Sequence, residues 1–209
     1  MDEKLSSLHC FKFSDDWFKS SKSIRRSFLD KLKKTVSKAA FKDGFVSRLY
    51  SSFRYDADLL VWNIADSFED LLSFKGALYD IKPFLLTETH SFFAVYTHPN
   101  KEYLKHDKKF KYMIAYPLKK DVSWYLLPES EKQRITKQHV DMAIKDENNT
   151  DIRSYTMYSF GIDDLEFLLF YETDSILDWM KTAMDLRKAE ARKWVTKEEP
   201  VFAGYNLML

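Results

Sequence analysis

Apolar residues recur along this chain in two spacings, one that alternates every second position and one that follows the helical period. Alternating or continuous apolar runs between turn residues are typical of strands, and an i, i+3, i+4, i+7 spacing is typical of amphipathic helices. The first spacing predicts strands or hairpins over residues 5–13, 45–54, 59–65, 90–97, 110–116, 152–172 and 201–209. The second predicts helices over residues 15–40, 68–79, 128–145 and 175–194.

The longest predicted helix begins at an aspartate that can cap it, Asp15 or Asp16, and reaches about Ala40. Its basic residues between 19 and 38 are interpreted as a solvated face rather than a nucleic-acid patch. Its apolar side comprises Phe18, Ile24, Phe28, Leu32 and Val36.

The chain also repeats itself. Residues 58–70 resemble residues 166–178, because each segment has an apolar run, an Asp-Ser pair and then a helical pattern. The shared order of elements favours an internal duplication. We therefore predict an α+β protein of the dimeric α+β barrel type, with two ferredoxin-like β-α-β-β-α-β halves in one chain, residues 1–100 and 101–209. Since each sheet has helices on one face, the halves or neighbouring subunits must cover the other face.

The composition of the chain argues against two classes of binding partner, nucleic acids and membranes. The 209 residues include 33 basic and 32 acidic side chains, a net charge of +1, whereas strong nucleic-acid binding requires a clear basic excess. No apolar run approaches the ~20 residues of a membrane span, and the N-terminus lacks the apolar core of a signal peptide. We expect no nucleic-acid or membrane partner, and a cytoplasmic location agrees with the single cysteine, Cys10.

The cysteine and glycine counts exclude several kinds of site. One cysteine cannot form a disulfide, a zinc–thiolate site or an iron–sulfur cluster within one chain. The glycines are Gly44, Gly76, Gly161 and Gly204, and they cannot form a P-loop, a dinucleotide-binding turn or a hydrolase nucleophile elbow. Kinase, Rossmann and ordinary α/β-hydrolase functions are therefore excluded.

His139 is the first candidate for chemistry. On its predicted helix it shares a face with Ile135, Met142 and Ala143, so its ring projects from an apolar stripe. A single histidine in such a place is more often a buried core residue than a ligand. The other histidines show no metal-ligand spacing, which argues against a zinc triad, whereas haem requires only one axial imidazole.

Tyr116 and Lys120 lie four residues apart where a predicted strand runs into a loop. A lysine there can bind a propionate through charge-assisted hydrogen bonds, and a tyrosine beside an oxidised haem can donate an electron or a hydrogen atom. Taken singly, the two are more often a tyrosine at the edge of the core and a solvated lysine. Trp124 and Tyr125 likewise fit an ordinary core.

Taken in order, these segments resemble the chlorite dismutase-like family, which includes the coproheme decarboxylases of bacterial haem synthesis. The family's Tyr-Pro-Met-x-Lys segment is similar to residues 116–120, Tyr-Pro-Leu-Lys-Lys. Its Trp-Tyr/Trp pair and its helix ending in Glu-His are similar to residues 124–125 and to Gln138-His139. Its Ser-Thr/Val-Gly-Leu/Phe-Asp-Asp turn is similar to residues 159–164, Ser-Phe-Gly-Ile-Asp-Asp.

The resemblance implies roles for individual residues. His139 matches the proximal iron ligand, and Glu190 matches the carboxylate that accepts the imidazole N–H. Lys120 matches a propionate-binding lysine, Trp124 an aromatic residue beside the porphyrin, and Tyr116 the tyrosine that attacks a propionate as a radical. The implied cofactor is haem b or iron coproporphyrin, the implied oxidant is peroxide, and the implied assembly is a homo-oligomer, usually a ring of five.

The sequence departs from the family at one position. True chlorite dismutases have a distal arginine on the strand after the ligand helix, and many coproheme decarboxylases have glutamine there. The matching position here is Ser154, with Arg153 one residue earlier. Neighbouring strand residues face opposite sides, so Arg153 is not expected to substitute unless the register slips by one residue. Chlorite dismutation is disfavoured accordingly.

The leading interpretation is a haem-binding oxidoreductase that resembles coproheme decarboxylase and removes porphyrin propionates in a peroxide-dependent reaction. Three alternatives stay open. One is a haem-binding or haem-transfer protein without turnover, another is a chlorite dismutase, and the third is a member of the family that binds no porphyrin.

Overall fold

The computed structural model describes residues 2–81, 85–98 and 108–209. In the first half of the chain the elements are β1 (Asp2–Phe13), α1 (Asp15–Lys19), α2 (Lys22–Ala40), β2 (Val46–Arg54), β3 (Ala57–Ala65), α3 (Phe68–Tyr79) and β4 (Leu86–His98). In the second half they are β5 (Tyr112–Lys120), α4 (Val122–Tyr125), α5 (Glu129–Lys145), η3 (Glu147–Asp151), β6 (Ile152–Tyr158), β7 (Phe167–Thr173), α6 (Ile176–Leu186), η4 (Glu190–Trp194), β8 (Val195–Lys197) and β9 (Phe202–Asn206).

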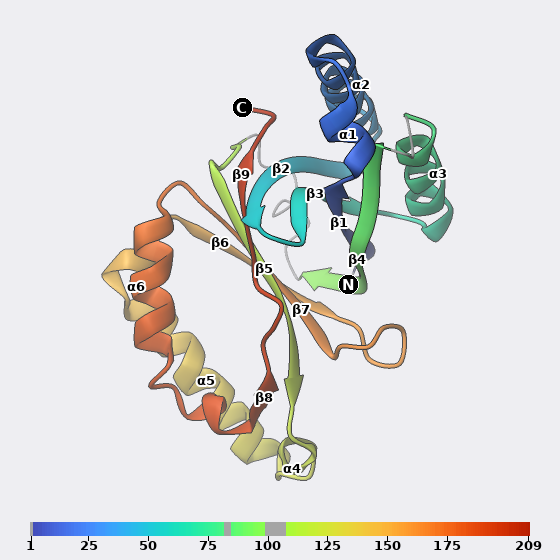
Figure 1. Cartoon of the computed structure of the whole chain (residues 1–209). Coiled ribbons are helices and arrows are strands. Elements are labelled where there is room, and N and C mark those ends of the chain that lie inside the picture. The colour runs from blue at the N-terminus through green and yellow to red at the C-terminus, as the bar shows by residue number, and fades with distance from the viewer. Residues whose placement is uncertain (1, 82–84, 99–107) are drawn as a thin grey trace.

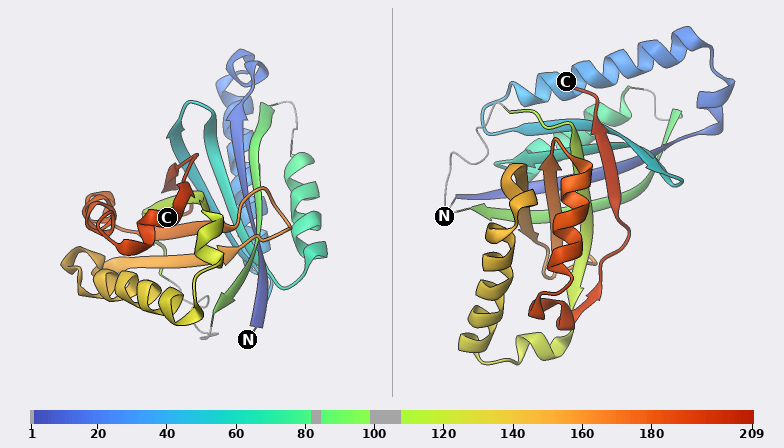
Figure 2. Two further views of the ribbon diagram at one scale, coloured as in Figure 1. Left: turned by 90° about the horizontal axis from the view of Figure 1, so that it is seen from below. Right: turned by 90° about the vertical axis from the view of Figure 1, so that its left-hand side faces the viewer.

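The strands form one antiparallel, barrel-like sheet in the order β7-β6-β4-β1-β3-β2-β9-β5-β8, and a further pairing of β7 with β5 closes the ring. Helices α1 to α3 lie on one side of the strands, and α5 and α6 lie on the other (Figures 1 and 2). The molecule is therefore a mixed α+β structure with helices outside a central barrel.

The two halves of the chain meet edge to edge at two short seams. At one seam β4 pairs with β6, through Val95 opposite Tyr158 and Tyr96 opposite Met157. At the other, β2 pairs with β9, for example Tyr50 opposite Asn206. These pairings leave few unpaired strand edges, and they fix how the second half lies against the first.

The barrel interior is an apolar core to which both halves contribute. Trp62 of β3 stacks on Phe170 of β7 with ring centroids 3.9 Å apart, and Tyr155 of β6 packs edge-on against Trp62. Leu8, Cys10, Met113 and Phe202 belong to the same cluster and are fully buried. This shared core covers the inner face that each helix-backed sheet leaves exposed.

A second core lies between the first half's sheet and its helices. Ser21 caps α2 by accepting a hydrogen bond from the backbone N–H of Ile24, and Phe28, Leu32 and Val36 then point one after another onto the sheet. The predicted helix over residues 15–40 is wrong in one respect, since it breaks at Ser20–Ser21 into α1 and α2.

The break changes which side chains are buried. Phe18 and Ile24 were expected on the apolar side and are exposed, while Trp17 of α1 is buried instead. Trp17 stacks on Phe13 of β1 with ring centroids 3.9 Å apart. The short helix α1 thus packs its apolar residue Trp17 against the sheet, and its orientation does not follow that of α2.

Other predicted elements need smaller corrections. The helix predicted over residues 175–194 is two pieces, α6 and the 3₁₀ helix η4, and the short elements α4 and β8 were missed. Most of the predicted connection at 97–109 lies outside the described residues. The description as two ferredoxin-like halves divided near residue 100 stays a prediction, although the strand orders β4-β1-β3-β2 and β9-β5-β7-β6 within the ring agree with it.

Replacing Gly204 by alanine is expected to destabilise the barrel. Gly204 lies on β9, where an added Cβ would come within 2.8 Å of the Cβ of Tyr50 and within 3.3 Å of the Cγ of Met113. Such overpacking should lower the free energy of unfolding by about 1–3 kcal/mol, measured by urea denaturation.

The same substitution at Gly76 is the matched control. Gly76 is an exposed glycine of helix α3 with nothing within 4 Å of an added Cβ, so alanine should stabilise the protein by about 0.5–1 kcal/mol. A Gly204→Ala protein as stable as the wild type would contradict the close approach of β9 to β2.

Candidate functional site: a cavity between the sheet and helices of the second half

A cavity of about 490 Å³ lies between the sheet and the helices of the second half. Alternation along the strands turns Tyr116, Leu118 and Lys120 of β5 and Leu169 and Tyr171 of β7 toward it. Its size and mostly apolar lining are typical of small-molecule sites. The remaining lining residues are Trp124, Thr136, His139, Val140, Thr156, Tyr158, Phe167, Trp179, Ala183, Leu186, Arg187, Ala191, Arg192, Val195 and Glu198.

The helices above this cavity bury little of their own surface. Helix α5 contributes one buried residue, Ile135, and α6 contributes one, Thr182. In the first half, α2 and α3 each contribute three. The layer between sheet and helices is therefore filled with side chains in the first half and hollow in the second.

His139 lies on α5 and lines the cavity. Burial, and then the charges of Lys120 and Arg192, hold the pKa of the imidazole below its usual value, so the ring is neutral at neutral pH. Its Nδ1 is buried without a hydrogen-bond partner among the residues that the structure describes. A neutral imidazole at an apolar cavity is the form that can ligate a metal.

Glu190 does not reach His139. Its carboxylate binds Arg134 at 2.8 Å and Lys193 at 3.2 Å, and Glu190 is not among the residues that line the cavity. The backbone N–H of Glu190 instead donates to the side-chain oxygen of Gln138, the neighbour of His139, at 3.1 Å. The structure thus connects residue 190 to the histidine's helix but does not form the expected imidazole–carboxylate contact.

Tyr116 and Tyr171 lie side by side on β5 and β7, with ring centroids 6.0 Å apart. Burial raises the pKa of Tyr116, and a hydrogen bond from Tyr171 only partly opposes this. Burial also raises the pKa of Tyr171. Both hydroxyl groups therefore keep their protons at neutral pH, and Tyr116 has the hydrogen atom that its predicted role requires.

Lys120 and Trp124 meet at one end of the cavity. The ammonium group of Lys120 lies 3.2 Å from the centre of the Trp124 ring, and Trp124 packs against Trp194. Burial lowers the pKa of Lys120 to about 8 despite the nearby Glu166. A half-buried cation of this kind attracts an anionic ligand more strongly than an exposed lysine does.

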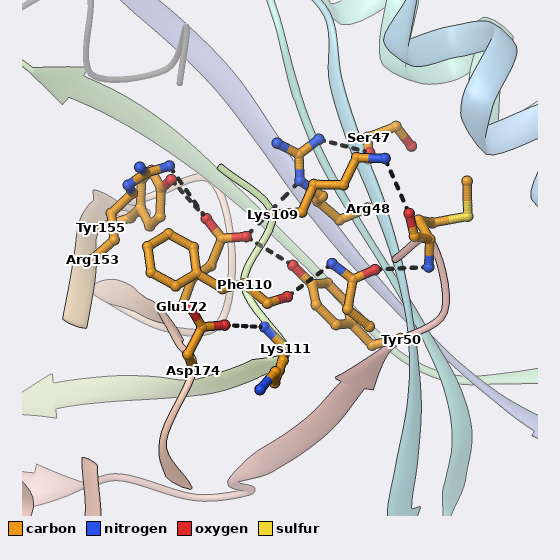
Figure 3. A network of polar contacts seen from close by, with 12 residues as sticks. Ser47, Arg48, Tyr50, Lys109, Phe110, Lys111, Arg153, Tyr155, Glu172 and Asp174 are labelled. Atoms are coloured by element: carbon orange, nitrogen blue, oxygen red, sulfur yellow. Dashed lines mark hydrogen bonds and ion pairs between the residues drawn. The ribbon is translucent and has the colours of Figure 1, made fainter. Parts of the chain in front are cut away.

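Ser154 and Arg153 occupy opposite sides of β6. Thr156 and Tyr158 line the cavity, so alternation places Ser154 on the same side, where it is exposed and outside the lining. Arg153 faces the barrel interior (Figure 3). Its guanidinium lies 4.8 Å from the Phe110 ring, and its Nη1 lies 3.9 Å from a carboxylate oxygen of Glu172.

The residues around Glu172 keep Arg153 in the barrel. Glu172 is buried and accepts hydrogen bonds from the hydroxyl groups of Tyr50 at 3.1 Å and Tyr155 at 2.9 Å (Figure 3). The Nε of Arg48 lies 3.9 Å from the same carboxylate. Moving Arg153 toward the cavity would remove a cation from a buried carboxylate, which is unfavourable.

Four residues that line the cavity were not predicted from the sequence. They are Tyr171, Arg187, Arg192 and Glu198. Tyr171 could have been found from the alternation of Phe167, Leu169 and Tyr171 along one strand. Arg187, Arg192 and Glu198 come together only because the chain breaks after α6 and turns back through η4 and β8. No local pattern in the sequence predicts that turn.

Within residues 2–81, 85–98 and 108–209, no group of three His, Cys, Asp or Glu side chains could hold a metal ion. A metal in this cavity would therefore need most of its ligands from a cofactor. Among those residues there is also no helix that is long and apolar enough to cross a membrane.

The sequence and structure are similar to those of known proteins. A family model described as chlorite dismutase matches residues 25–207. The coproheme decarboxylase of Mycolicibacterium smegmatis is 28% identical over 162 residues, which make up 74% of this chain and 69% of the relative.

Two solved structures share the fold. A crystal structure provisionally assigned as a chlorite dismutase has a TM-score of 0.89 and 27% identity over 98% of this chain and 95% of its own. A haem-binding protein from Thermus thermophilus has a TM-score of 0.86 and 20% identity over 99% and 92%. Because the family model spans most of the sequence and these folds agree over nearly their whole length, the chain belongs to the chlorite dismutase family.

Proposed function

We propose that the protein is a haem-dependent oxidoreductase that removes carbon dioxide from the propionates of iron coproporphyrin, with peroxide as the oxidant. One observation carries the proposal. A neutral imidazole (His139), a protonated tyrosine (Tyr116) and a half-buried lysine (Lys120) line one largely apolar cavity. The relative named coproheme decarboxylase supports the same choice of substrate.

The residues present fit an iron porphyrin. Iron in a porphyrin needs one axial ligand from the protein, and His139 is a neutral imidazole that can be that ligand. Aromatic and aliphatic side chains such as Trp124, Phe167 and Leu169 offer apolar walls for the macrocycle. Lys120 offers a charge-assisted hydrogen bond to a propionate. Haem b would fit the same features, although it has fewer carboxylates.

When bound, the iron porphyrin would supply, together with peroxide, the oxidising power for the reaction. Overall, a propionic acid group and one hydrogen peroxide would give a vinyl group, carbon dioxide and two waters. Lys120 holds the propionate in its carboxylate form, and the Tyr116 hydroxyl gives up a hydrogen atom and recovers one from the propionate side chain. The hydrogen bond from Tyr171 orients the Tyr116 hydroxyl, and burial keeps that hydroxyl protonated in the resting protein.

A haem-binding or haem-transfer protein without turnover is the second candidate. The observation that favours it is the cavity side of β6, which carries Ser154, Thr156 and Tyr158 and no cation that would help to activate peroxide. The same side argues against chlorite dismutation, because Arg153 points into the barrel. Peroxide-dependent loss of carboxyl groups distinguishes the first candidate from the second.

We also infer that the two ferredoxin-like halves arose by duplication and that the protein forms a homo-oligomeric ring of five. The matching strand orders of the halves support the first inference. Phe53 and Tyr55, at the tip of the β2–β3 hairpin, support the second, because these large apolar side chains are almost fully exposed.

Replacing His139 by alanine should remove the proposed iron ligand. Haem titration of the wild-type protein is expected to shift the Soret absorption band, and His139→Ala should abolish that shift and weaken haem binding at least about tenfold. His90→Ala is the control, since His90 is a half-buried histidine of β4 outside the cavity. An unchanged spectrum with His139→Ala would contradict the assignment.

Replacing Tyr116 by phenylalanine should stop the reaction and preserve binding. With iron coproporphyrin and peroxide, mass spectrometry should find decarboxylation slowed at least about a hundredfold, because the relayed hydrogen atom is missing. Tyr112→Phe, on the same strand but outside the cavity lining, should react normally. Normal turnover by Tyr116→Phe would rule out its role.

The affinity for metal-free coproporphyrin should fall as pH rises from 7 to 9. Burial lowers the pKa of Lys120 to about 8, so the ammonium group that attracts a carboxylate is lost across this range. Fluorescence titration should find a fall of about fivefold to tenfold. The fall in affinity should vanish in Lys120→Gln. It should persist in Lys119→Gln, which changes the preceding residue of β5. A wild-type affinity that does not depend on pH would contradict this role for Lys120.

A further inference from the structure

Helix α2 concentrates positive charge on the first half of the chain. Its 19 residues include seven basic side chains and one acidic side chain, Asp30. Since the whole chain has 33 basic and 32 acidic side chains, 26 basic and 31 acidic side chains remain outside α2. The helix is therefore a positive region on a protein whose remainder is negative. Its basic residues are Lys22, Arg25, Arg26, Lys31, Lys33, Lys34 and Lys38.

The cations of α2 lack carboxylate partners. Among the residues that the structure describes, none of the seven forms an ion pair with an aspartate or a glutamate. Arg25 lies 5.9 Å from the ring of Trp17, which leaves its charge in place. Helix α5 of the second half differs, because it has four basic and three acidic residues and three of its basic side chains are paired. The charge of α2 is thus available to a partner outside the chain.

The helical period arranges these cations in two rows, one along each side of the outward face of α2. Small polar residues, Ser23 and Ser37, lie between the rows. Helix α2 itself is on the outside of the molecule, away from α5 and α6 (Figures 1 and 2). A flat anionic surface laid against α2 therefore contacts both rows at once. The first row is Lys22, Arg26 and Lys33, and the second is Lys31, Lys34 and Lys38.

An exposed phenylalanine extends this face. Phe41 directly follows α2, keeps a helical backbone conformation and is 90% exposed. It comes three residues after Lys38 and seven after Lys34, so it projects on the side of the second row. A phospholipid surface accepts both kinds of side chain, because its phosphates bind lysines and the layer below them takes up an aromatic ring. Nucleic acid suits the helix less well, since α2 has no Asn or Gln to read base edges.

We propose that α2 and Phe41 form a docking surface for a membrane that contains anionic phospholipids. The expectation of no membrane partner depended on the lack of a spanning segment and on the net charge of the whole chain. Neither bears on association through one face, for which a cluster of about four to eight basic side chains is enough. The cavity lies across the barrel from α2, between the sheet and α5 and α6. Docking therefore leaves the cavity uncovered and requires neither a porphyrin nor the proposed reaction.

The test is sedimentation of the protein with vesicles made of equal parts of phosphatidylcholine and phosphatidylglycerol, and with vesicles of phosphatidylcholine alone. The wild type should bind the anionic vesicles at least about tenfold more tightly than the neutral ones. Salt at about 1 M should abolish the difference, because the Debye length falls to about 3 Å. Replacing Lys31, Lys34 and Lys38 together by glutamine should weaken binding to anionic vesicles at least about tenfold. Phe41→Ser should weaken it about threefold to tenfold and preserve its dependence on salt.

Replacing Lys137, Lys145 and Lys181 together by glutamine is the matched control. These are exposed lysines of α5 and α6, and their replacement changes the net charge of the chain by the same amount on the other side of the barrel. Vesicle binding should stay within about twofold of the wild type, because distant exposed charges are screened. Thermal unfolding shows that each variant is folded, and Phe41→Ser keeps the test valid if the triple variant of α2 is not.

Equal binding of the wild type to anionic and neutral vesicles would overturn the docking surface. It is also overturned if the control variant loses as much binding as the α2 variant, since the charge of the whole chain would then be responsible. Binding to a double-stranded DNA fragment but not to anionic vesicles would assign α2 to nucleic acid instead. None of these results affects the proposed function, because porphyrin titration tests that function in solution without vesicles.

Discussion

The space between a sheet and the helices that cover it must be filled, because apolar surface facing an empty or water-filled gap is unfavourable. In the first half of this chain, side chains of α2 and α3 such as Phe28, Leu32 and Phe74 fill that space. In the second half, α5 and α6 bury one residue each and leave a cavity of about 490 Å³. A ligand that fills this cavity takes the place of the missing core and stabilises the fold through its binding energy.

Burial beside that cavity also sets the charge states on which the proposed chemistry depends. It keeps the imidazole of His139 neutral and the hydroxyl of Tyr116 protonated, and it lowers the pKa of Lys120 to about 8. The guanidinium groups of Arg187 and Arg192 both donate hydrogen bonds to the carboxylate of Glu198. Exclusion of water thus favours the protonation states that the proposed iron ligand, hydrogen-atom donor and propionate-binding lysine require.

Much of this arrangement could be predicted from sequence where it depends on short-range periodicity. The two-residue period of β5 was enough to put Tyr116 and Lys120 on one face, and the helical period of α5 was enough to turn His139 toward an apolar surface. The opposite orientations of Arg153 and Ser154 also follow from the strand period, and the buried Glu172 shows what Arg153 faces instead.

Features that depend on how distant segments turn could not be predicted in this way. The sequence of residues 175–194 has the pattern of one helix, but the structure breaks it after Leu186. Glu190 then lies outside the cavity lining and binds Arg134. That break also brings Arg187 and Arg192 to Glu198. The family resemblance suggested that Glu190 accepts the imidazole N–H of His139, whereas the structure shows its carboxylate with Arg134 and Lys193.

The most direct test is a crystal structure of the protein grown with iron coproporphyrin. The account predicts that the macrocycle lies between β5–β7 and helices α5 and α6, with the imidazole of His139 bound to the iron. A porphyrin bound elsewhere on the protein, or a cavity closed by its own side chains in the presence of the porphyrin, would contradict it.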